Sequence, residues 1–318
     1  MIPAATTIDK LRRSWLFSDM GMAISPRGVS QRIASSKNTH KGRGMPASNA
    51  ITPDKLARLV GSPGAPRIID LRGTPAHAIP GSVFPPHPSP AQWNHPAGLA
   101  AVIVDAAGGG SAIAAAAILR SEGVAAEVLE GGFEAWAAAG LPTVSLAHLP
   151  PRHPDGRSWW VTRARPKVDR IACPWLIRRF VDPDARFLFV APAAVLTVAV
   201  EQRAEPFDIT GEGVFCSHRG ERCTFDVMVE AFGLATHAPL ARLAEIVRGA
   251  DTDRLDIVPE AAGLLAISLG LSRLHSDDHA QLEAGTAVYD ALYRWCRDAQ
   301  GEKHDWSSHL PTRGKVPA

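Results

Sequence analysis

Hydrophobic and polar positions follow two different rhythms along the first half of the chain. Residues 67–72 (RIIDLR) and 101–104 (AVIV) are short apolar runs of strand length, whereas residues 53–60 and 111–121 carry apolar side chains at helical spacing. A further strand, a Gly-Gly turn and a helix follow over residues 125–140 (AAEVLEGGFEAWAAAG). Strands that alternate with helices predict an α/β domain with a mostly parallel sheet and helices on both faces.

Beyond residue 157 the pattern becomes mainly helical and predicts a second domain of the α+β class, dominated by helices. Two long segments, 238–249 (APLARLAEIVRG) and 277–298, repeat apolar residues at helical spacing, and Ser276 is the expected N-cap of the later one. Ahead of these helices, residues 159–162 (WWVT) predict a strand.

These patterns divide the chain into five segments. The N-terminal segment is rich in Ser, Arg, Lys and Gly, which predicts a flexible basic tail, and Met45 within it is a candidate natural start. A proline-rich stretch without periodicity predicts a linker between the two domains. The segments are residues 1–48 (tail), 49–144 (α/β domain), 145–157 (linker), 158–300 (second domain) and 301–318 (frayed tail).

The composition is that of a soluble globular protein, with 46% hydrophobic and 21% charged residues among 318. The net charge of +2 is uneven, because residues 1–44 alone carry +6. A folded part with net negative charge disfavours general nucleic-acid binding. No apolar stretch has the length of a membrane span. No continuous apolar run follows the basic residues near the N-terminus, so a secretory signal is not expected. Four cysteines without a CxxC pair predict reduced thiols in the cytoplasm.

Three blocks of the first domain resemble the rhodanese family: IIDLR with IPGS, the strand, glycine loop and helix over 102–120, and VLEGGFEAWAAAGLP. In that family the first residue of the loop is a cysteine that carries a persulfide, and the resemblance places Asp105 at this position. A carboxylate cannot accept sulfur and pass it on, so we expect an inactive sulfurtransferase. We also expect Asp105 to occupy the loop amides with its own charge, in a domain that serves as a scaffold or docking module.

Arginine and lysine crowd into residues 157–190, with Asp169 as the main opposing charge. The two-residue period of a strand would put Arg163 and Arg165 on one side, ahead of a helix that starts near Asp169 or Pro174. Guanidinium groups suit tetrahedral oxyanions, which accept hydrogen bonds in pairs. The alternative is a solvated face with ion pairs to acidic helices. The predicted anion-binding residues are Arg163, Arg165, Lys167, Arg170 and Arg219.

Two further clusters carry side chains suited to metal or redox chemistry, residues 216–226 (CSHRGERCTFD) and 276–283 (SDDHAQLE). A histidine and a carboxylate at i and i+4 can share a metal ion, and a divalent metal is the one cofactor left open. The alternative is that Asp277 and Asp278 only complement a helix N-terminus. Cys173 and Cys296 also fit as small core residues. The candidate metal ligands are His218, Glu221, His279 and Glu283, and the redox candidates are Cys173 and Cys223.

Several separated blocks of the second domain, in order, are similar to the C-terminal domain of the ChrB chromate-resistance family over most of residues 158–297. These blocks are RPKVDRIACPWLIRRFVDPDARFLFV, PFDITGEGVFCSHRGERCTFD, IVRGADTDR, AAGLLAISLGLSR and YDALYRWC. The resemblance implies a role in bacterial chromate resistance, a stress response. Some members are chromate-responsive transcriptional regulators that resemble one another in an N-terminal domain, and here a rhodanese-like unit stands in its place.

The function expected from both resemblances is a cytoplasmic chromate-resistance protein whose second domain recognises or handles chromate or sulfate, two dianions of the same shape. A chromate-responsive DNA-binding regulator is the first alternative, and the sequence lacks a recognisable helix-turn-helix. A sulfurtransferase or a metal-dependent enzyme is the second alternative. Assembly into a homo-oligomer is left open.

Overall fold

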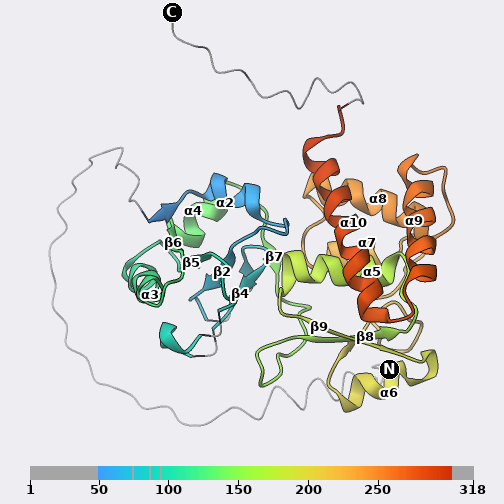
Figure 1. The fold of residues 1–318 in the computed structure, drawn as a ribbon, viewed down its shortest axis with the longest axis horizontal. Helices are drawn as coiled ribbons and strands as arrows, with labels where there is room; N and C mark the ends of the chain where they lie inside the picture. The colour runs from blue at the N-terminus through green and yellow to red at the C-terminus, as the bar shows by residue number, and fades with distance from the viewer. Residues whose placement is uncertain (1–48, 74, 86, 94, 303–318) are drawn as a thin grey trace, which may run out of the picture.

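The computed structural model describes residues 49–302, except residues 74, 86 and 94 (Figure 1). The predicted basic tail and the residues after 302 lie outside the described residues. The first domain has a five-stranded sheet in the order β1-β6-β5-β2-β4, in which every neighbouring pair is parallel. Its strands are β1 Ala50–Ile51, β2 Arg67–Asp70, β4 Ser82–Val83, β5 Ala101–Val104 and β6 Ala126–Leu129.

Helices cover both faces of this sheet, which confirms the α/β prediction for the first domain. The helix α3 packs with Ile69 and Ile103 on one face, whereas Leu56 of α2 and Trp136 of α4 pack with Val102 on the other. All four residues of β5 are buried, as a central strand covered on both faces requires. The bounds are α2 Pro53–Leu59, the 3₁₀ turn η1 Pro90–Gln92, α3 Gly110–Ser121 and α4 Gly132–Ala138.

The segment expected as a linker begins inside a strand and is attached to its surroundings. Strand β7 (Val144–Ser145) pairs antiparallel with β3 (His77–Ala78). The Ser145 amide also donates to Phe232 O of the second domain, at 2.9 Å. Further along, His153 stacks on Trp159 with 4.3 Å between ring centroids.

The second domain contains a three-stranded parallel sheet in the order β10-β8-β9. One helical crossover connects β8 to its parallel neighbour β9, as parallel neighbours require, and a second connects β9 to β10 on the other side of β8. The first crossover consists of α5 and a π-helical segment, η2, and the second consists of η3 and α6. The bounds are β8 Trp159–Arg163, α5 Asp169–Leu176, η2 Ile177–Val181, β9 Arg186–Val190, η3 Pro192–Ala194, α6 Val195–Glu201 and β10 Glu205–Pro206.

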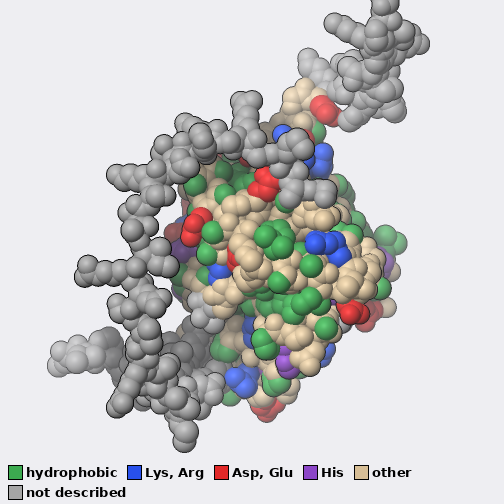
Figure 2. Space-filling model, turned by 90° about the vertical axis from the view of Figure 1, so that its left-hand side faces the viewer, with side chains coloured by type: hydrophobic (Ala, Val, Ile, Leu, Met, Phe, Trp, Pro, Cys, Tyr) green, Lys and Arg blue, Asp and Glu red, His purple; other side chains and the backbone are tan. Residues whose placement is uncertain are grey.

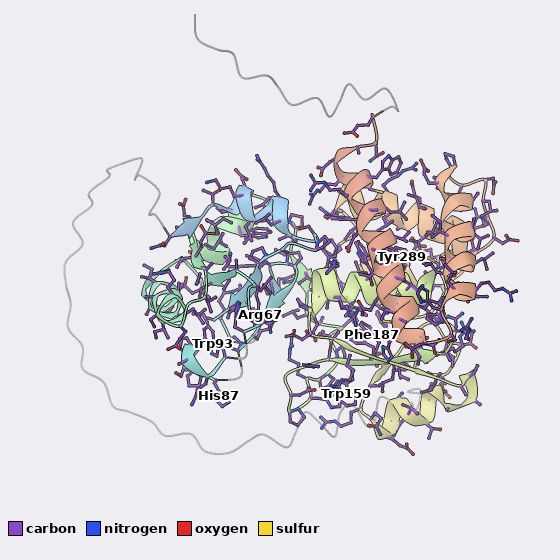
Figure 3. The ribbon with its side chains drawn as sticks, in the orientation of Figure 1. Arg67, His87, Trp93, Trp159, Phe187 and Tyr289 are labelled. Carbon is purple, nitrogen blue, oxygen red and sulfur yellow. The ribbon has the colours of Figure 1, made fainter. Side chains whose placement is uncertain are left out.

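Four helices pack beside this sheet: α7 Thr224–Ala231, α8 Ala238–Asp251, α9 Glu260–Leu274 and α10 Asp278–Asp298. The mainly helical α+β class is confirmed. The predicted N-cap of α10 is wrong by one residue, because the Asp277 carboxylate accepts the Ala280 amide at 2.7 Å and so takes the place expected for Ser276. Tyr289 of α10 donates to Val168 O at 2.9 Å and ties this helix to the start of α5 (Figure 3).

The two domains share one apolar core. A single cluster of buried residues contains Leu56 and Trp136 of the first domain together with Trp175, Phe180 and Tyr293 of the second. The Gly81 amide donates to Phe180 O at 2.7 Å across the same boundary. Arg67 lies between the domains, and its guanidinium makes two hydrogen bonds to the Asp184 carboxylate (Figure 3).

The outer side of the first domain, where α3 lies, carries few and well separated charged side chains (Figure 2). On α3, Ile113 and Ile118 are 55% and 39% exposed. Within residues 49–302, as far as they are described, no helix is both long and apolar enough to cross a membrane.

Candidate functional site

Two of the predicted arginines meet at one buried carboxylate. Arg163, the last residue of β8, and Arg170, in the first turn of α5, lie 2.9 Å and 3.2 Å from Asp208 Oδ2. Asp208 follows β10 and is 5% exposed. Its backbone φ of +49 is in the left-handed region that non-glycine residues rarely adopt. The chain therefore accepts local strain to place this carboxylate between the two guanidinium groups.

The other predicted cations lie in different surroundings. Arg165 has a φ of +59 and donates from its guanidinium to Ser272 O and His275 O at the C-terminus of α9. The expectation that Arg163 and Arg165 share one side of a strand is wrong, because β8 ends at Arg163 and the chain turns. Lys167 is exposed, and Arg219 donates to Phe215 O at 3.1 Å.

A second buried carboxylate lies beside Asp208. Asp169 is the first residue of α5 and fully buried, and it accepts the Thr224 amide at 2.6 Å and the Phe225 amide at 3.4 Å. It thereby satisfies amides at the start of α7, which have no partner within that helix. The Thr224 hydroxyl donates to Asp208 at 3.0 Å. One threonine therefore joins the two carboxylates.

His218 completes the site and brings in a third carboxylate. Its Nε2 atom lies 3.4 Å from Asp169 Oδ2, 3.4 Å from Asp208 Oδ1 and 3.1 Å from Asp251 Oδ2. Asp251 is the last residue of α8, and its other oxygen accepts the Asp169 amide at 3.3 Å. The imidazole is 41% exposed, whereas the three carboxylates are 17% exposed or less. We call these four residues the carboxylate–histidine cluster.

The charges of the cluster are strongly coupled. Hydrogen bonds to Asp169, Asp208 and Asp251 raise the pKa of His218 to about 12, so the imidazole is protonated at neutral pH. Burial raises the pKa of Asp169, and the charges of Asp251 and Asp208 raise it further, although His218 opposes them. Burial also acts on Asp208, but His218 and Arg163 outweigh it and lower the pKa of that carboxyl. The positive charge of His218 thus offsets the repulsion among the three neighbouring carboxylates.

The donor set fits a divalent metal ion. Among the described residues, Asp169, Asp208 and His218 form the one group of three or more potential ligands, with ligand atoms within 4.8 Å of one another. One imidazole nitrogen and several carboxylate oxygens suit Mn²⁺, Fe²⁺ or Zn²⁺. The metal would replace the proton on Nε2, because a ligating imidazole must be neutral.

Of the four metal ligands predicted from the sequence, the structure brings only His218 into this cluster. Glu221 pairs with Arg254 at 3.1 Å, and Glu283 pairs with Arg178 at 2.6 Å. His279 packs edge-on against Phe189, with 5.3 Å between ring centroids.

The sequence pattern indicates Asp169 only as an opposing charge or a helix start, and it does not reveal Asp208 or Asp251 as metal ligands. The available signal was the position of Asp208 between Phe207 and Ile209, in the otherwise uncharged stretch PFDIT. A carboxylate buried in such surroundings needs a partner.

The cysteines are packed in the interior. All four are buried, including the redox candidates Cys173 and Cys223. Burial raises the pKa of both thiols, and the charge of Asp169 raises it further. The thiol form is therefore favoured, whereas the thiolate is the reactive species. Cys173 and Cys296 have the core positions that the sequence allowed for them.

In the first domain, Asp105 occupies the glycine loop with its own carboxylate. Its oxygens accept the amides of Gly108, Gly109 and Ala112 and the Ser111 hydroxyl, at 2.5 to 3.2 Å. Burial alone would raise the pKa of Asp105, but these bonds outweigh burial and lower it. The loop also packs closely on the following turn, because a Cβ at Gly132 would collide with Gly108 N and Asp105 O.

Comparison with known proteins identifies both halves of the chain. Residues 52–139 match the rhodanese-like domain model, and residues 160–296 match the model of the ChrB C-terminal domain. The chain thus combines a rhodanese-like domain with a ChrB C-terminal domain. The protein ChrB of Cupriavidus metallidurans is 35% identical over 160 residues, which are 48% of this chain and 46% of that relative. The match spans about half the length of the curated relative.

Solved structures are also similar to part of the chain. A rhodanese-related protein from Thermoplasma volcanium is 22% identical and covers 30% of this chain and 97% of its own, with a TM-score of 0.26. A thiosulfate sulfurtransferase from Pseudomonas aeruginosa is 27% identical and covers 38% of this chain and 23% of its own, also with a TM-score of 0.26. The carboxylate–histidine cluster lies entirely within the ChrB C-terminal domain.

Proposed function

We propose that this is a cytoplasmic chromate-resistance protein whose ChrB C-terminal domain binds a divalent metal ion and, beside it, an oxyanion such as chromate or sulfate. The observation that carries the proposal is the approach of His218 Nε2 to three carboxylates at 3.1 to 3.4 Å. The match to the ChrB C-terminal domain supports the connection to chromate resistance.

The carboxylates and the histidine of the cluster have different roles. Asp169, Asp208 and Asp251 supply negative charge, and His218 supplies a neutral nitrogen once its proton has left. The three carboxylates that would bind the metal ion therefore belong to α5, α8 and the segment after β10. Because these elements pack against each other, the ligand positions are fixed before the ion arrives.

The guanidinium groups of Arg163 and Arg170 favour the binding of an anion next to the metal ion. Arg163 is 38% exposed, and its Nε is a buried donor without an acceptor among the described residues. Arg170 donates to Ala164 O at 3.0 Å, which fixes the direction of its guanidinium. A dianion gains charge-assisted hydrogen bonds from both groups. Arg165, Lys167 and Arg219 stay sequence predictions for this role.

The rhodanese-like domain supports the second domain and does not transfer sulfur. Asp105 replaces the sulfur carrier and satisfies the amides that a bound anion would otherwise occupy. Because the two domains share one apolar core, the rhodanese-like domain has a structural role.

The proposal is tested by calorimetric titration of sulfate into the protein with and without Mn²⁺. We expect sulfate to bind more tightly when Mn²⁺ is present, and about tenfold more weakly in Arg163→Gln and Arg170→Gln, since each variant loses a charge-assisted donor. Arg294→Gln is the matched control, because this arginine is 66% exposed on α10 and pairs with Asp298 at 2.7 Å, outside the carboxylate–histidine cluster. Equal sulfate binding in all three variants, or no effect of Mn²⁺, contradicts the proposal.

A further inference from the structure

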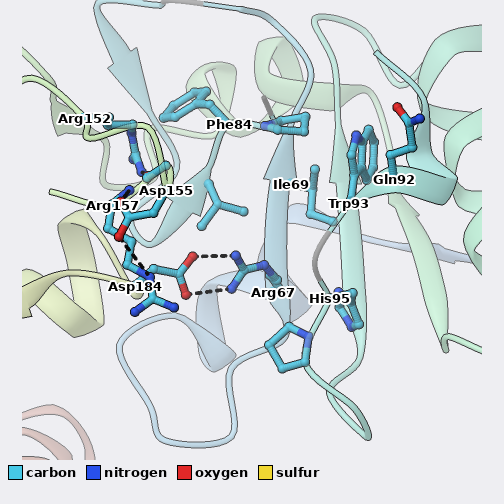
Figure 4. Close-up of a pocket in the computed structure, with 14 residues that line it drawn as sticks. Arg67, Ile69, Phe84, Gln92, Trp93, His95, Arg152, Asp155, Arg157 and Asp184 are labelled. Atoms are coloured by element: carbon cyan, nitrogen blue, oxygen red, sulfur yellow. Dashed lines mark hydrogen bonds and ion pairs between the residues drawn. The ribbon is translucent and has the colours of Figure 1, made fainter. Parts of the chain in front are cut away.

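A cavity of about 260 Å³ lies between the two domains, away from the carboxylate–histidine cluster (Figure 4). The first domain contributes β2, the end of β4 and the segment around Trp93. The second domain contributes Asp184, and the segment 152–157 closes one side. The lining includes neither the cluster nor Asp105, so neither site already described accounts for this cavity.

Two buried polar atoms of the lining residues have no partner within the described part of the chain. Arg152 donates from Nη1 to Gly156 O at 2.6 Å, whereas its Nη2 is buried without an acceptor. His95 donates from Nε2 to Leu99 O at 2.6 Å, and its Nδ1 is buried without a partner. An unpaired buried polar group costs free energy. An acceptor on a ligand would recover that cost at Arg152 Nη2, whereas His95 Nδ1, the acceptor nitrogen of the neutral ring, would need a donor.

Positive charge exceeds negative charge among the lining residues. Three guanidinium groups, of Arg67, Arg152 and Arg157, face the carboxylates of Asp155 and Asp184. Asp184 uses both oxygens on Arg67, at 3.1 and 2.5 Å. Arg157 is 42% exposed, and its Nε is 4.0 Å from Asp155, so its donors are only weakly engaged. An anion can therefore accept hydrogen bonds from Arg152 and Arg157, whereas Arg67 is already paired with Asp184.

The opposite wall is apolar and partly aromatic. Figure 4 shows Ile69 and Trp93 across the cavity from Arg152 and Arg157, whereas the Phe84 ring lies beside Arg152, 5.7 Å from its guanidinium carbon. The Trp93 indole donates to His87 O at 2.7 Å, which fixes the orientation of its ring. A planar or apolar group can be buried against this wall, whereas a bare inorganic ion would leave it uncovered.

We propose that this cavity binds a small organic anion that carries one carboxylate or phosphate group on a planar or apolar body. Arg152 and Arg157 hold the anionic group, and Phe84 and Trp93 cover the body. Because both domains contribute to the lining, the bound molecule links them. The proposal needs no metal ion and stands independently of the proposed function.

The test is calorimetric titration of the full chain with benzoate, phenyl phosphate and inorganic phosphate, in buffer free of divalent cations. One of the two organic anions is expected to bind with a stoichiometry of one and more tightly than inorganic phosphate. Arg157→Gln is expected to weaken this binding about tenfold, the cost of one charge-assisted contact. Arg222→Gln is the matched control, since Arg222 is 45% exposed and pairs with Glu230 outside the cavity.

Three results would overturn the proposal. The first is that neither organic anion binds the wild-type chain at millimolar concentration. The second is that Arg157→Gln binds as tightly as the wild type, which places the anion elsewhere. The third is that inorganic phosphate binds as tightly as the organic anions, which removes the role of the aromatic wall. Arg152→Gln gives an independent second variant, whose fold is checked first by circular dichroism because Arg152 also lies 3.5 Å from the buried Asp182.

Discussion

At the scale of single residues, the site depends on side chains that no local pattern connects. His218 could be predicted as a ligand because it lies in a block dense in Cys, Arg and Glu. Its partners Asp169, Asp208 and Asp251 come from three other segments, and only the fold brings them together. Val168 and Asp208, with φ of +29 and +49, adopt conformations that sequence periodicity does not reveal.

A half-buried histidine outside the cluster, His237, gives a prediction about pH. Burial, reinforced by the charge of Arg297, lowers the pKa of His237 to about 4 from an ordinary value of 6.5. The unfolded chain therefore binds one more proton than the folded chain between these values, and stability falls as pH falls from 6.5 to 4. The loss amounts to at most about 3 kcal/mol, because one pKa unit corresponds to about 1.4 kcal/mol.

Urea unfolding of the wild type and of His237→Gln at pH 7 and pH 4.5 measures this effect. We expect a smaller loss of unfolding free energy on acidification in the variant, because glutamine does not titrate. His279→Gln is the control, since His279 lies in another part of the second domain, against Phe189. An identical pH dependence in the wild type and His237→Gln would show that His237 is not responsible.

At the scale of elements, periodicity predicted strands β2, β5, β6 and β8 and the long helices α8 and α10, but not the two-residue strands. The apolar face predicted for 238–249 is the buried face of α8, with Leu240, Leu243 and Val247. Strand β10 has two residues, and its parallel pairing with β8 leaves no signature in the sequence. The side chain of Arg165 was also unpredictable, because it depends on a turn after β8 and on α9, which lies far along the chain.

The loop before α3 gives a prediction at this scale. Asp105→Ala removes the acceptor of the Gly108, Gly109 and Ala112 amides, so the free energy of unfolding should fall by about 1–2 kcal/mol, as for a lost helix cap. Urea unfolding measures this change, and Asp54→Ala, at an exposed position of α2, is the control. Neither the wild type nor Asp105→Ala should transfer sulfur from thiosulfate to cyanide. Turnover by the wild type that is lost in Asp105→Ala would contradict the structural role.

At the scale of the whole molecule, the two domains that the sequence separates are joined by one core. Periodicity shows that a face is apolar but not which partner covers it, so the contacts of Phe180 and Tyr293 with the first domain could not be predicted. The prolines of the expected linker suggested separation, yet Ser145 bonds to Phe232 O across the boundary. The pattern of elements and the family resemblances therefore predicted the fold class of each domain but gave no information on how the domains pack.

Gly61 tests this shared core. It has a φ of +75, and a Cβ there would collide with the Phe180 ring and lie 3.0 Å from Tyr293 Cε1. Gly61→Ala should lower the free energy of unfolding by about 2–4 kcal/mol, from overpacking and backbone strain together. Gly98→Ala is the matched control, because Gly98 has a φ of +77 and no atom lies within 4 Å of a Cβ at that position. Equal stability of the two variants in urea would show that the domains do not pack here in solution.

The central claim is that the carboxylate–histidine cluster is a metal site, and titration with Mn²⁺ and Zn²⁺ tests it most directly. Calorimetry of the full chain should show one ion per chain, with affinity that rises with pH because binding expels the proton of His218. His218→Gln and Asp251→Asn should weaken binding at least about tenfold, the effect of removing one ligand, whereas His279→Gln should leave it unchanged. Failure of the wild type to bind either ion, or equal binding by His218→Gln, would contradict the account.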